Sequence, residues 1–313
     1  MINEVTASEI CHELTATTQL GAPVRREPIR IWQLSGVERL HLCGGRTVVF
    51  KYASSPFTTE DHLLRFAESH GVPVSALYAS TVRDGVLGMI LEDLGAPDRD
   101  ATDATAAEAA ARLHITGPMP DAPTLGRAEL QNLPSTARAN LAKLQAECRF
   151  PNVDDIRQAL TTLERIAGRR AIGAEQPPFG FCHGELHPTS LHIGSTGWRL
   201  VDFAKAHNGP GLLDLATWHG TRLPPNLPRM RRLITAYIAA GGPVTARGHR
   251  GGVPPENWAL GWHRIHAAAW YLKQAAHNIN DPTTDPACIP VIRRQLTSAV
   301  RLLTQAGNSL PLP

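Results

Sequence analysis

The sequence predicts a mixed α/β protein of the α+β type, in which a small antiparallel sheet is followed by a larger, mainly helical region. Near the N-terminus, three short segments rich in β-branched and aromatic residues are separated by Ser-Gly and Gly-Gly pairs, which favour turns. These segments are 28–34, 39–42 and 47–52. Beyond residue 95, the long patterned segments have the apolar spacing of helices. We therefore expect two parts, residues 1–95 with the sheet and residues 96–313 with most of the helices.

Composition limits the class of protein. The chain has 313 residues, of which 42% are hydrophobic, so it can bury a sizeable core. It contains no run of about 18 apolar residues, and Glu4, Glu9 and Glu13 stand where a signal peptide would need basic and then apolar residues. The five cysteines form no Cys-x-x-Cys pair and predict neither a disulfide framework nor a zinc site. We expect a cytoplasmic protein with no membrane partner.

The remaining regular elements are predicted from the same patterns. A strand is expected over 85–94, where GVLGMILEDL is apolar and ends in acids. Helices are expected at 6–14, 59–70, 105–115, 136–148, 154–169, 229–240, 255–278 and 289–305. Four prolines between Pro118 and Pro134 predict an extended connection before the helix that starts near residue 136.

The stretch 181–216 gathers the largest number of polar groups between apolar runs. A polar loop containing Glu185 leads to two short strands, 191–193 and 198–201, and Asp202 follows the second strand. Because these strands are short, Glu185 and Asp202 should lie at the same edge of the structure. Two carboxylates placed in this way suit a site for a metal ion and phosphate groups.

The letters HGELHPTSLHI at 183–193, LVDF at 200–203 and DLA at 214–216 resemble segments of the aminoglycoside phosphotransferase and choline kinase-like family. That family's pattern is close to HGDxHxxN, then IDW or IDF, then DLA. The resemblance implies a two-lobed protein-kinase-like fold, with a small antiparallel-sheet N-lobe and a large, mainly helical C-lobe. It also implies transfer of the γ-phosphoryl group of ATP or GTP, with Mg²⁺, to a hydroxyl of a small molecule.

The resemblance gives roles to individual residues. Glu185 stands at the position of the catalytic carboxylate, which orients the attacking hydroxyl and accepts its proton, and His183 would support the loop. Ser190 stands where the family has an Asn that binds magnesium, and Asp202 matches the metal-binding Asp. Asp214, the Asp of DLA, would brace this region.

Two of these positions depart from the family pattern. Glu185 has one methylene more than the usual Asp, and a displacement of about 1 Å can cost about a hundredfold in rate. Ser190 keeps an oxygen but has a shorter reach than Asn. A nucleotide-binding pseudoenzyme that has lost catalysis is therefore the alternative. Activity is favoured because Lys51 and Asp202 are retained, and we expect Glu185, Asp202 and Lys51 to face one cavity.

The nucleotide would be held by the first part of the chain. Lys51 ends an apolar strand, where an unpaired ammonium is costly, and resembles the family's phosphate-binding lysine. We expect Glu60, in the first turn of the next helix, to pair with it. The alternative is that Lys51 reaches water while Glu60 complements the helix dipole. Ser35 lies in the turn expected to cover the nucleotide, and backbone groups near Glu92 and Leu94 would bind its base.

The distribution of charge bears on the partners. Residues 1–95 contain eight Lys plus Arg and eleven Asp plus Glu, whereas residues 203–313 contain twelve and four. The basic residues form no long run or RNA-binding motif, so no nucleic-acid partner is expected. A pocket for a polycationic aminoglycoside should be rich in carboxylates. We therefore expect a neutral or weakly charged acceptor, such as a nucleoside-type, glycosylated or polyketide antibiotic, and a role in resistance or self-protection.

One further pattern concerns the acceptor. Trp258, Trp262, His266 and Trp270 recur every four residues of an expected helix and therefore share one face. Such a face suits stacking on a planar or sugar ring, and the alternative is that the rings pack the helical core. The sequence leaves the identity of the acceptor, the choice between ATP and GTP and the oligomeric state open.

Overall fold

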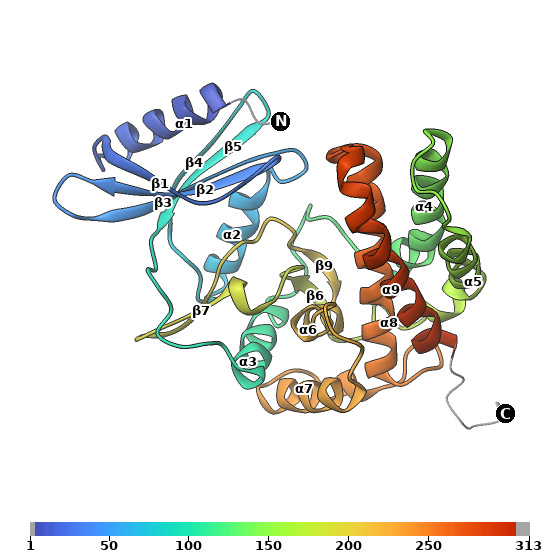
Figure 1. Ribbon diagram of the computed structural model, residues 1–313. Helices are drawn as coiled ribbons and strands as arrows, with labels where there is room; N and C mark the ends of the chain where they lie inside the picture. Colours follow the sequence, from blue (N-terminus) through green and yellow to red (C-terminus); the bar gives the residue numbers. More distant parts are fainter. Residues whose placement is uncertain (1–3, 305–313) are drawn as a thin grey trace. The chain divides into compact units, whose positions relative to one another are not determined.

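The computed structural model describes residues 4–304 (Figure 1). The chain divides into two compact units. The first unit consists of the residues up to Thr102 together with Pro188–Ala206, and the second of Asp103–His187 together with the residues from His207 onward. A small antiparallel sheet in the first unit and a mainly helical second unit confirm the predicted fold class. Between residues 4 and 304, no helix has the length and apolar character needed to cross a membrane.

The sheet of the first unit has five antiparallel strands in the order β1-β2-β3-β5-β4. The strands are β1 (Pro23–Trp32), β2 (Ser35–Leu42), β3 (Thr47–Ser54), β4 (Leu77–Arg83) and β5 (Val86–Glu92). Strand β4 was not predicted, because this edge strand is mostly half-buried or exposed and lacks a regular apolar alternation. The predicted turn at Ser35 is wrong, since Ser35 already pairs with Trp32 and Ala53 as the first residue of β2.

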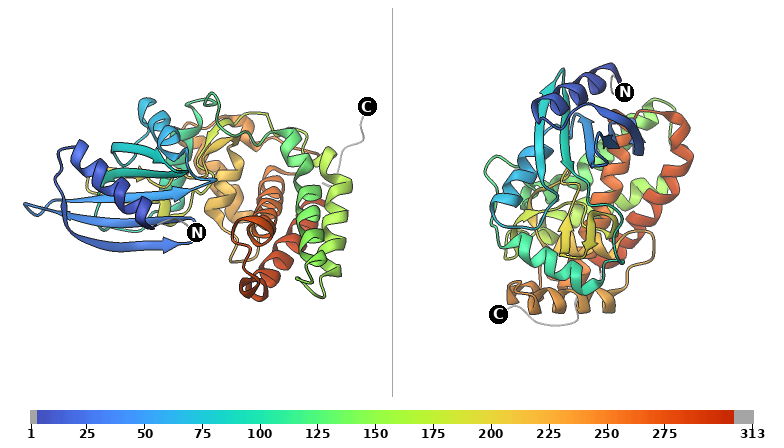
Figure 2. Two further views of the ribbon diagram at one scale, coloured as in Figure 1. Left: turned by 90° about the horizontal axis from the view of Figure 1, so that it is seen from above. Right: turned by 90° about the vertical axis from the view of Figure 1, so that its left-hand side faces the viewer.

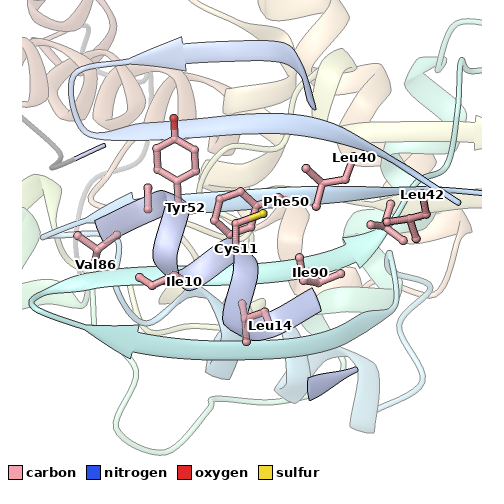
Figure 3. Packing of buried hydrophobic residues seen from close by; sticks show 11 residues of the cluster. Ile10, Cys11, Leu14, Leu40, Leu42, Phe50, Tyr52, Val86 and Ile90 are labelled. Atoms are coloured by element: carbon pink, nitrogen blue, oxygen red, sulfur yellow. The ribbon is translucent and has the colours of Figure 1, made fainter. Parts of the chain in front are cut away.

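Helix α1 (Glu4–Thr17) covers one face of this sheet (Figures 1 and 3). Its buried side chains, which include Ile10, Cys11 and Leu14, pack against Phe50 and other apolar residues of the strands. Gly88 of β5 permits this close approach, because a Cβ atom at that position would clash with the side chain of Ile10. The predicted helix at 6–14 is therefore part of the core of the first unit.

Helix α2 (Glu60–Ser69) and the hairpin β7 (Leu191–Gly194) and β8 (Gly197–Leu200) complete the first unit. The hairpin is attached through backbone bonds from Leu200 N to Pro73 O, at 2.9 Å, and from Asp98 N to Ile193 O, at 2.8 Å. These bonds explain why residues 188–206, far along the chain, group with the N-terminal sheet.

The second unit consists mainly of helices, which Figure 2 shows from two further directions. They are α3 (Asp103–His114), α4 (Arg127–Ala146), α5 (Asp154–Arg170), α6 (Leu212–His219), α7 (Leu227–Ala239), α8 (Pro255–Lys273) and α9 (Asp285–Thr304). Two short strands, β6 (Phe179–Cys182) and β9 (His207–Pro210), pair antiparallel. Helices α4 and α5 pack against each other, and they contact α8 and α9 respectively.

The start of α4 differs from the prediction. The prolines suggested a helix beginning near residue 136, but α4 begins at Arg127 and contains Pro134 in its interior. A proline removes one backbone hydrogen bond. Here the 20-residue helix also buries Leu130, Leu141 and Leu144, so packing of its apolar face outweighs that loss.

Candidate active site

In the first unit, Lys51 forms ion pairs with two acidic side chains. It lies on β3, opposite Val37 of β2 and Met89 of β5, and its side chain is almost entirely buried. Its Nζ atom donates a hydrogen bond to Oε1 of Glu60 at 2.6 Å and to Oδ1 of Asp202 at 2.5 Å. Lys51 therefore pairs with Glu60 instead of reaching water, and one ammonium group bridges two carboxylates.

This shared ammonium determines the ionisation of the cluster. Burial disfavours the charged form of Lys51, but the adjacent Glu60 and Asp202 carboxylates outweigh it and raise the pKa of Lys51 above its ordinary value. Burial, reinforced by the charge of Asp202, raises the pKa of Glu60 to about 7 although Lys51 opposes this shift. Lys51 is thus a fixed positive charge suited to binding phosphate groups, and Glu60 titrates near neutral pH.

Asp202 follows β8 and has a φ of 69°. A non-glycine residue in this left-handed region is uncommon and is found more often at functional sites than elsewhere. Ser190, which ends the 3₁₀ turn η1 (Pro188–Ser190), is buried, and its carbonyl accepts a hydrogen bond from the N–H of Val201 at 3.0 Å. The hairpin therefore brings Ser190 next to the residue that precedes Asp202. A carboxylate and a hydroxyl are oxygen ligands of the kind that Mg²⁺ binds.

Glu92 and Leu94 differ in the use of their polar groups. The N–H of Glu92 donates to Ala76 O at 2.8 Å, its carbonyl accepts from Ser75 Oγ, and its carboxylate pairs with Arg199 at 2.5 Å. These bonds occupy the N–H, the carbonyl and the carboxylate of Glu92 with partners inside the first unit. Among residues 4–304, by contrast, the backbone of Leu94 is not hydrogen-bonded to any other group. Of these two residues, Leu94 is the one whose backbone groups have no partner within residues 4–304. The Ser35 hydroxyl accepts a hydrogen bond from Nε1 of Trp32.

Asp214 organises the loop that carries Glu185 in the second unit. From α6, its carboxylate accepts hydrogen bonds from the N–H of His183 at 2.6 Å and of Gly184 at 2.8 Å, and from Nε2 of His114 at 3.2 Å. Burial opposes its ionisation, but the His114 hydrogen bond and the nearby histidines lower the pKa of Asp214 to about 2. The N–H of Glu185 donates to Nδ1 of His183 at 3.3 Å. Asp214 and His183 thus fix the backbone of the Glu185 loop.

The predicted aromatic face on α8 is only partly accessible. Trp258 and Trp262 have no exposed surface, and the Nε1 groups of both rings donate to the carbonyl of Arg170, at 2.7 and 3.2 Å. They belong to the core, as the alternative that these rings pack the helical region expects. Both indole N–H groups donate to one buried backbone carbonyl, and no sequence pattern indicates this acceptor. His266 and Trp270 are half-buried and stay candidates.

Part of the basic excess of residues 203–313 is buried or paired with acids. Arg250 and Arg264 are buried and donate to backbone carbonyls, such as Pro177 O at 2.6 Å and Leu223 O at 2.7 Å. Arg229, Arg231 and Arg293 pair with Asp103, Glu256 and Asp155. The count of charges in the sequence therefore does not describe the surface that an acceptor would meet, and the charge around each candidate residue has to be considered separately.

Comparison with known proteins identifies the family. The model of the phosphotransferase enzyme family, APH, matches residues 39–250. Among curated protein sequences, none matches the chain. Similar solved structures include choline kinase from Cryptosporidium parvum, with 9% identity, a TM-score of 0.62, and 96% of this chain and 94% of that chain covered. A choline/ethanolamine kinase family protein from Mesorhizobium loti has 17% identity, a TM-score of 0.61, and coverages of 94% and 99%.

An amicoumacin kinase, solved in complex with AMP-PNP, Ca²⁺ and its antibiotic, has 13% identity, a TM-score of 0.60, and coverages of 95% and 96%. At these identities the likeness establishes the fold, which is the kinase-like fold expected from the sequence. The family model covers more than half of the chain, including Lys51, Glu185 and Asp202. The chain therefore belongs to the phosphotransferase enzyme family.

Proposed function

We propose that the protein transfers the γ-phosphoryl group of ATP or GTP to a hydroxyl group of a small molecule. The observation that carries this proposal is the buried ammonium of Lys51, held 2.6 Å from Glu60 and 2.5 Å from Asp202. A lysine fixed by a carboxylate, beside a second carboxylate that suits a metal ion, is the arrangement on which phosphoryl transfer depends. Such groups bind and orient the phosphates, and positioning supplies most of the catalysis.

In this proposal the residues of the first unit hold the nucleotide. Lys51 binds the phosphate oxygens, and Glu60 keeps its ammonium in place. Leu94 offers its backbone groups to the base. Asp202 and Ser190 supply oxygen ligands for Mg²⁺, and their chemistry fits that ion. A bound Mg²⁺ supplies positive charge that offsets the charge of the phosphates.

The Glu185 loop of the second unit receives the acceptor. The carboxylate of Glu185 accepts the hydrogen bond of the acceptor hydroxyl, orients its oxygen, and takes its proton as the new O–P bond forms. His183 and Asp214 keep the loop backbone fixed through the bonds described above. A flexible carboxylate would lose much of the benefit of orientation, so these two residues act as positioning residues.

We further propose a neutral or weakly charged antibiotic as the acceptor, and inactivation of that antibiotic in the cytoplasm as the role. Local charge supports this better than the overall charge count. The segment from Asn257 to Asn280 contains no Asp or Glu. It includes His266 and Trp270, the half-buried residues that stay candidates for contact with the acceptor. A polycationic acceptor in contact with this segment would find no carboxylate there.

The test is incubation of the protein with ATP or GTP, Mg²⁺ and each compound of a fixed panel, followed by mass spectrometry of the compound. The panel consists of erythromycin, puromycin, amicoumacin, kanamycin and choline. We expect the mass of one phosphoryl group to be added to a neutral or weakly charged member. Nucleotide binding without transfer to any compound would support the pseudoenzyme instead, and transfer only to kanamycin would contradict the proposed acceptor class.

A further inference from the structure

Helix α8 is mostly buried, but one stripe of it is partly exposed, formed by His263, His266, Ala267, Trp270, Tyr271 and Lys273. His263, His266 and Trp270 are half-buried members of this stripe, and the buried Gln274 continues it at the same spacing. Residues three and four positions apart lie on the same face of a helix. We call these four residues the α8 stripe. Its four residues are polar or aromatic, and they lie beside the half-buried Ala267 and Tyr271 and the exposed Lys273.

Polar atoms along this line are buried without hydrogen-bond partners. Within the described part of the chain, Oε1 of Gln274, Nδ2 of Asn278 and Nδ1 of His263 have no hydrogen-bond partner. Gln274 is only 4% exposed. An unpaired buried polar group costs about 1–3 kcal/mol, so the two on Gln274 and Asn278, four residues apart, need an explanation. Gln274 offers an acceptor and Asn278 a donor, one helical turn apart. A hydroxyl group can satisfy both, because it donates and accepts.

The backbone holds these two amides in an unusual conformation. Residues Gln274–Asn278 form a π-helical turn, in which the N–H groups of Ile279 and Asn280 both donate to Gln274 O. The turn is fixed to α4 by Lys143 Nζ, 2.5 Å from Ala276 O, and by the His277–Asn140 bond of 3.0 Å. Short π-helical turns are rare and occur often at functional sites. The π turn is therefore a second observation, independent of the unpaired atoms, that points to a binding site.

The position of the α8 stripe and the charges near it indicate which kind of ligand it would bind. Helix α6, which carries Asp214, packs against α8, and Asp214 is among the charges that act on His263. One end of the stripe thus lies near the brace of the Glu185 loop. Gln274 lies eleven positions after His263, which is about 16 Å along the helix axis at 1.5 Å per residue. Residues 257–280 contain no acid, and the acids near the π turn are paired: Glu147 with Lys143 at 3.5 Å, and Asp285 with Arg149, which also donates to Oδ1 of Asn280 at 2.7 Å.

We propose that the α8 stripe binds the acceptor of the proposed phosphoryl transfer, and that Gln274 and Asn278 bind a hydroxyl remote from the one that is phosphorylated. The inference rests on the proposed function. It assigns the acceptor to elongated, uncharged or weakly charged hydroxylated molecules, with a flat or sugar ring against Trp270. An aromatic side chain offers a face on which such a ring stacks. Gln274 and Asn278 are binding residues for this ligand and take no part in the chemical step.

The experiment compares Gln274→Leu and Asn278→Leu with Gln158→Leu, which replaces an exposed glutamine of α5 in the same unit. Affinity for each of the five panel compounds is measured by calorimetric titration without nucleotide, and the melting temperature is recorded for every variant. We expect Gln274→Leu and Asn278→Leu to weaken binding of erythromycin or puromycin by about tenfold, the effect of one lost hydrogen bond of average to high strength.

The melting temperature separates binding from a structural role. Gln274→Leu removes a buried carbonyl that has no partner, so its melting temperature should be equal to or higher than that of the wild type. The affinity for nucleotide should not change. A lower melting temperature with unchanged affinity for the compounds would show that Gln274 serves the fold, and would overturn the proposal.

The outcomes also separate this proposal from the proposed function. If a compound is phosphorylated and binds the wild type and Gln274→Leu equally, the stripe proposal fails and the kinase function stands. If a compound binds in a Gln274-dependent way but is never phosphorylated, the stripe proposal stands and the kinase function fails. Binding of kanamycin alone, or of no compound in the panel, overturns the assigned acceptor class.

Discussion

Nζ of Lys51 lies 2.6 Å from Oε1 of Glu60, which is almost completely buried on the first turn of α2. The helix that follows β3 thus holds a strand lysine in one position. Asp202 shares the same ammonium, although it is 151 residues further along the chain. Because both contacts lie within one compact unit, this charge cluster belongs to the folded unit itself.

Replacing Lys51 by Met should abolish most of the transfer. The loss of a buried, oriented positive charge should lower kcat by about 10²–10³-fold, the typical effect of removing one group that stabilises charge in the transition state. Steady-state kinetics measures this effect, with Arg65→Met as the control, because Arg65 is exposed on α2. Activity of Lys51→Met within a few-fold of the control would contradict the role given to Lys51.

Glu60 makes stability depend on pH. Its pKa is 4.5 in the unfolded reference and about 7 in the folded protein. Between these values the unfolded chain has released the Glu60 proton and the folded chain keeps it, so the free energy of unfolding falls as the pH rises. We expect the stability of the wild type relative to Glu60→Gln to decrease by a few kcal/mol across this window, at about 1.4 kcal/mol per pH unit.

Urea unfolding at constant ionic strength measures this difference. Glu68→Gln is the matched control, since Glu68 is exposed on the same helix. The Glu68→Gln variant and the wild type should have parallel pH profiles. If Glu60→Gln also ran parallel to the wild type, Glu60 would be ionised at the same pH in the folded and unfolded states.

Asp214 should matter to both stability and rate. In Asp214→Asn, one carboxylate oxygen becomes an NH₂ donor that faces the N–H of either His183 or Gly184, because each of these groups donates to a different oxygen. We expect a loss of about 2–4 kcal/mol in the free energy of unfolding, together with a lower kcat, because the Glu185 loop loses its brace. Chemical denaturation and kinetics test this, with Asp154→Asn as the control, whose side chain is 87% exposed. An unperturbed kcat in Asp214→Asn would contradict the bracing role.

Glu185 is tested by two substitutions of different kinds. Glu185→Gln keeps the length and removes the base, so kcat should fall by about 10²–10⁴-fold, while the KM for nucleotide changes little. Glu185→Asp keeps the base and shortens its reach by one methylene. If the loop is built around Glu, this variant should lose about a hundredfold in kcat. A gain in activity in Glu185→Asp would show instead that Glu185 is an impaired replacement for Asp.

The sequence predicted the parts of the site that are encoded locally. Lys51 at the end of an apolar strand and Glu60 in the next helix turn are close in the chain, and their pairing was expected from these patterns together with the family resemblance. The bond from Lys51 to Asp202 joins residues 151 positions apart. The family motif around Asp202 led us to expect both residues in one cavity, but their direct bond was not predicted.

The features that the sequence did not predict depend on tertiary packing. Trp258 and Trp262 share a helical face with Trp270, but they are buried because their indole groups meet the carbonyl of Arg170. Strand β4 lies at a sheet edge and has no apolar alternation. The π turn at Gln274–Asn278, which contacts α4 through Ala276 O and His277, was not predicted either. Each of these depends on neighbours that are distant in the chain.

The account depends most on Glu185 meeting the acceptor hydroxyl while Lys51 and Asp202 hold the phosphates. The most direct measurement is a crystal structure with a non-hydrolysable ATP analogue, Mg²⁺ and the phosphorylatable compound. We predict a Glu185 carboxylate oxygen within about 3 Å of the hydroxyl, which is hydrogen-bond distance, with Lys51 on a phosphate oxygen and Asp202 on the metal ion. A structure with the acceptor bound and Glu185 turned away from its hydroxyl would contradict this account.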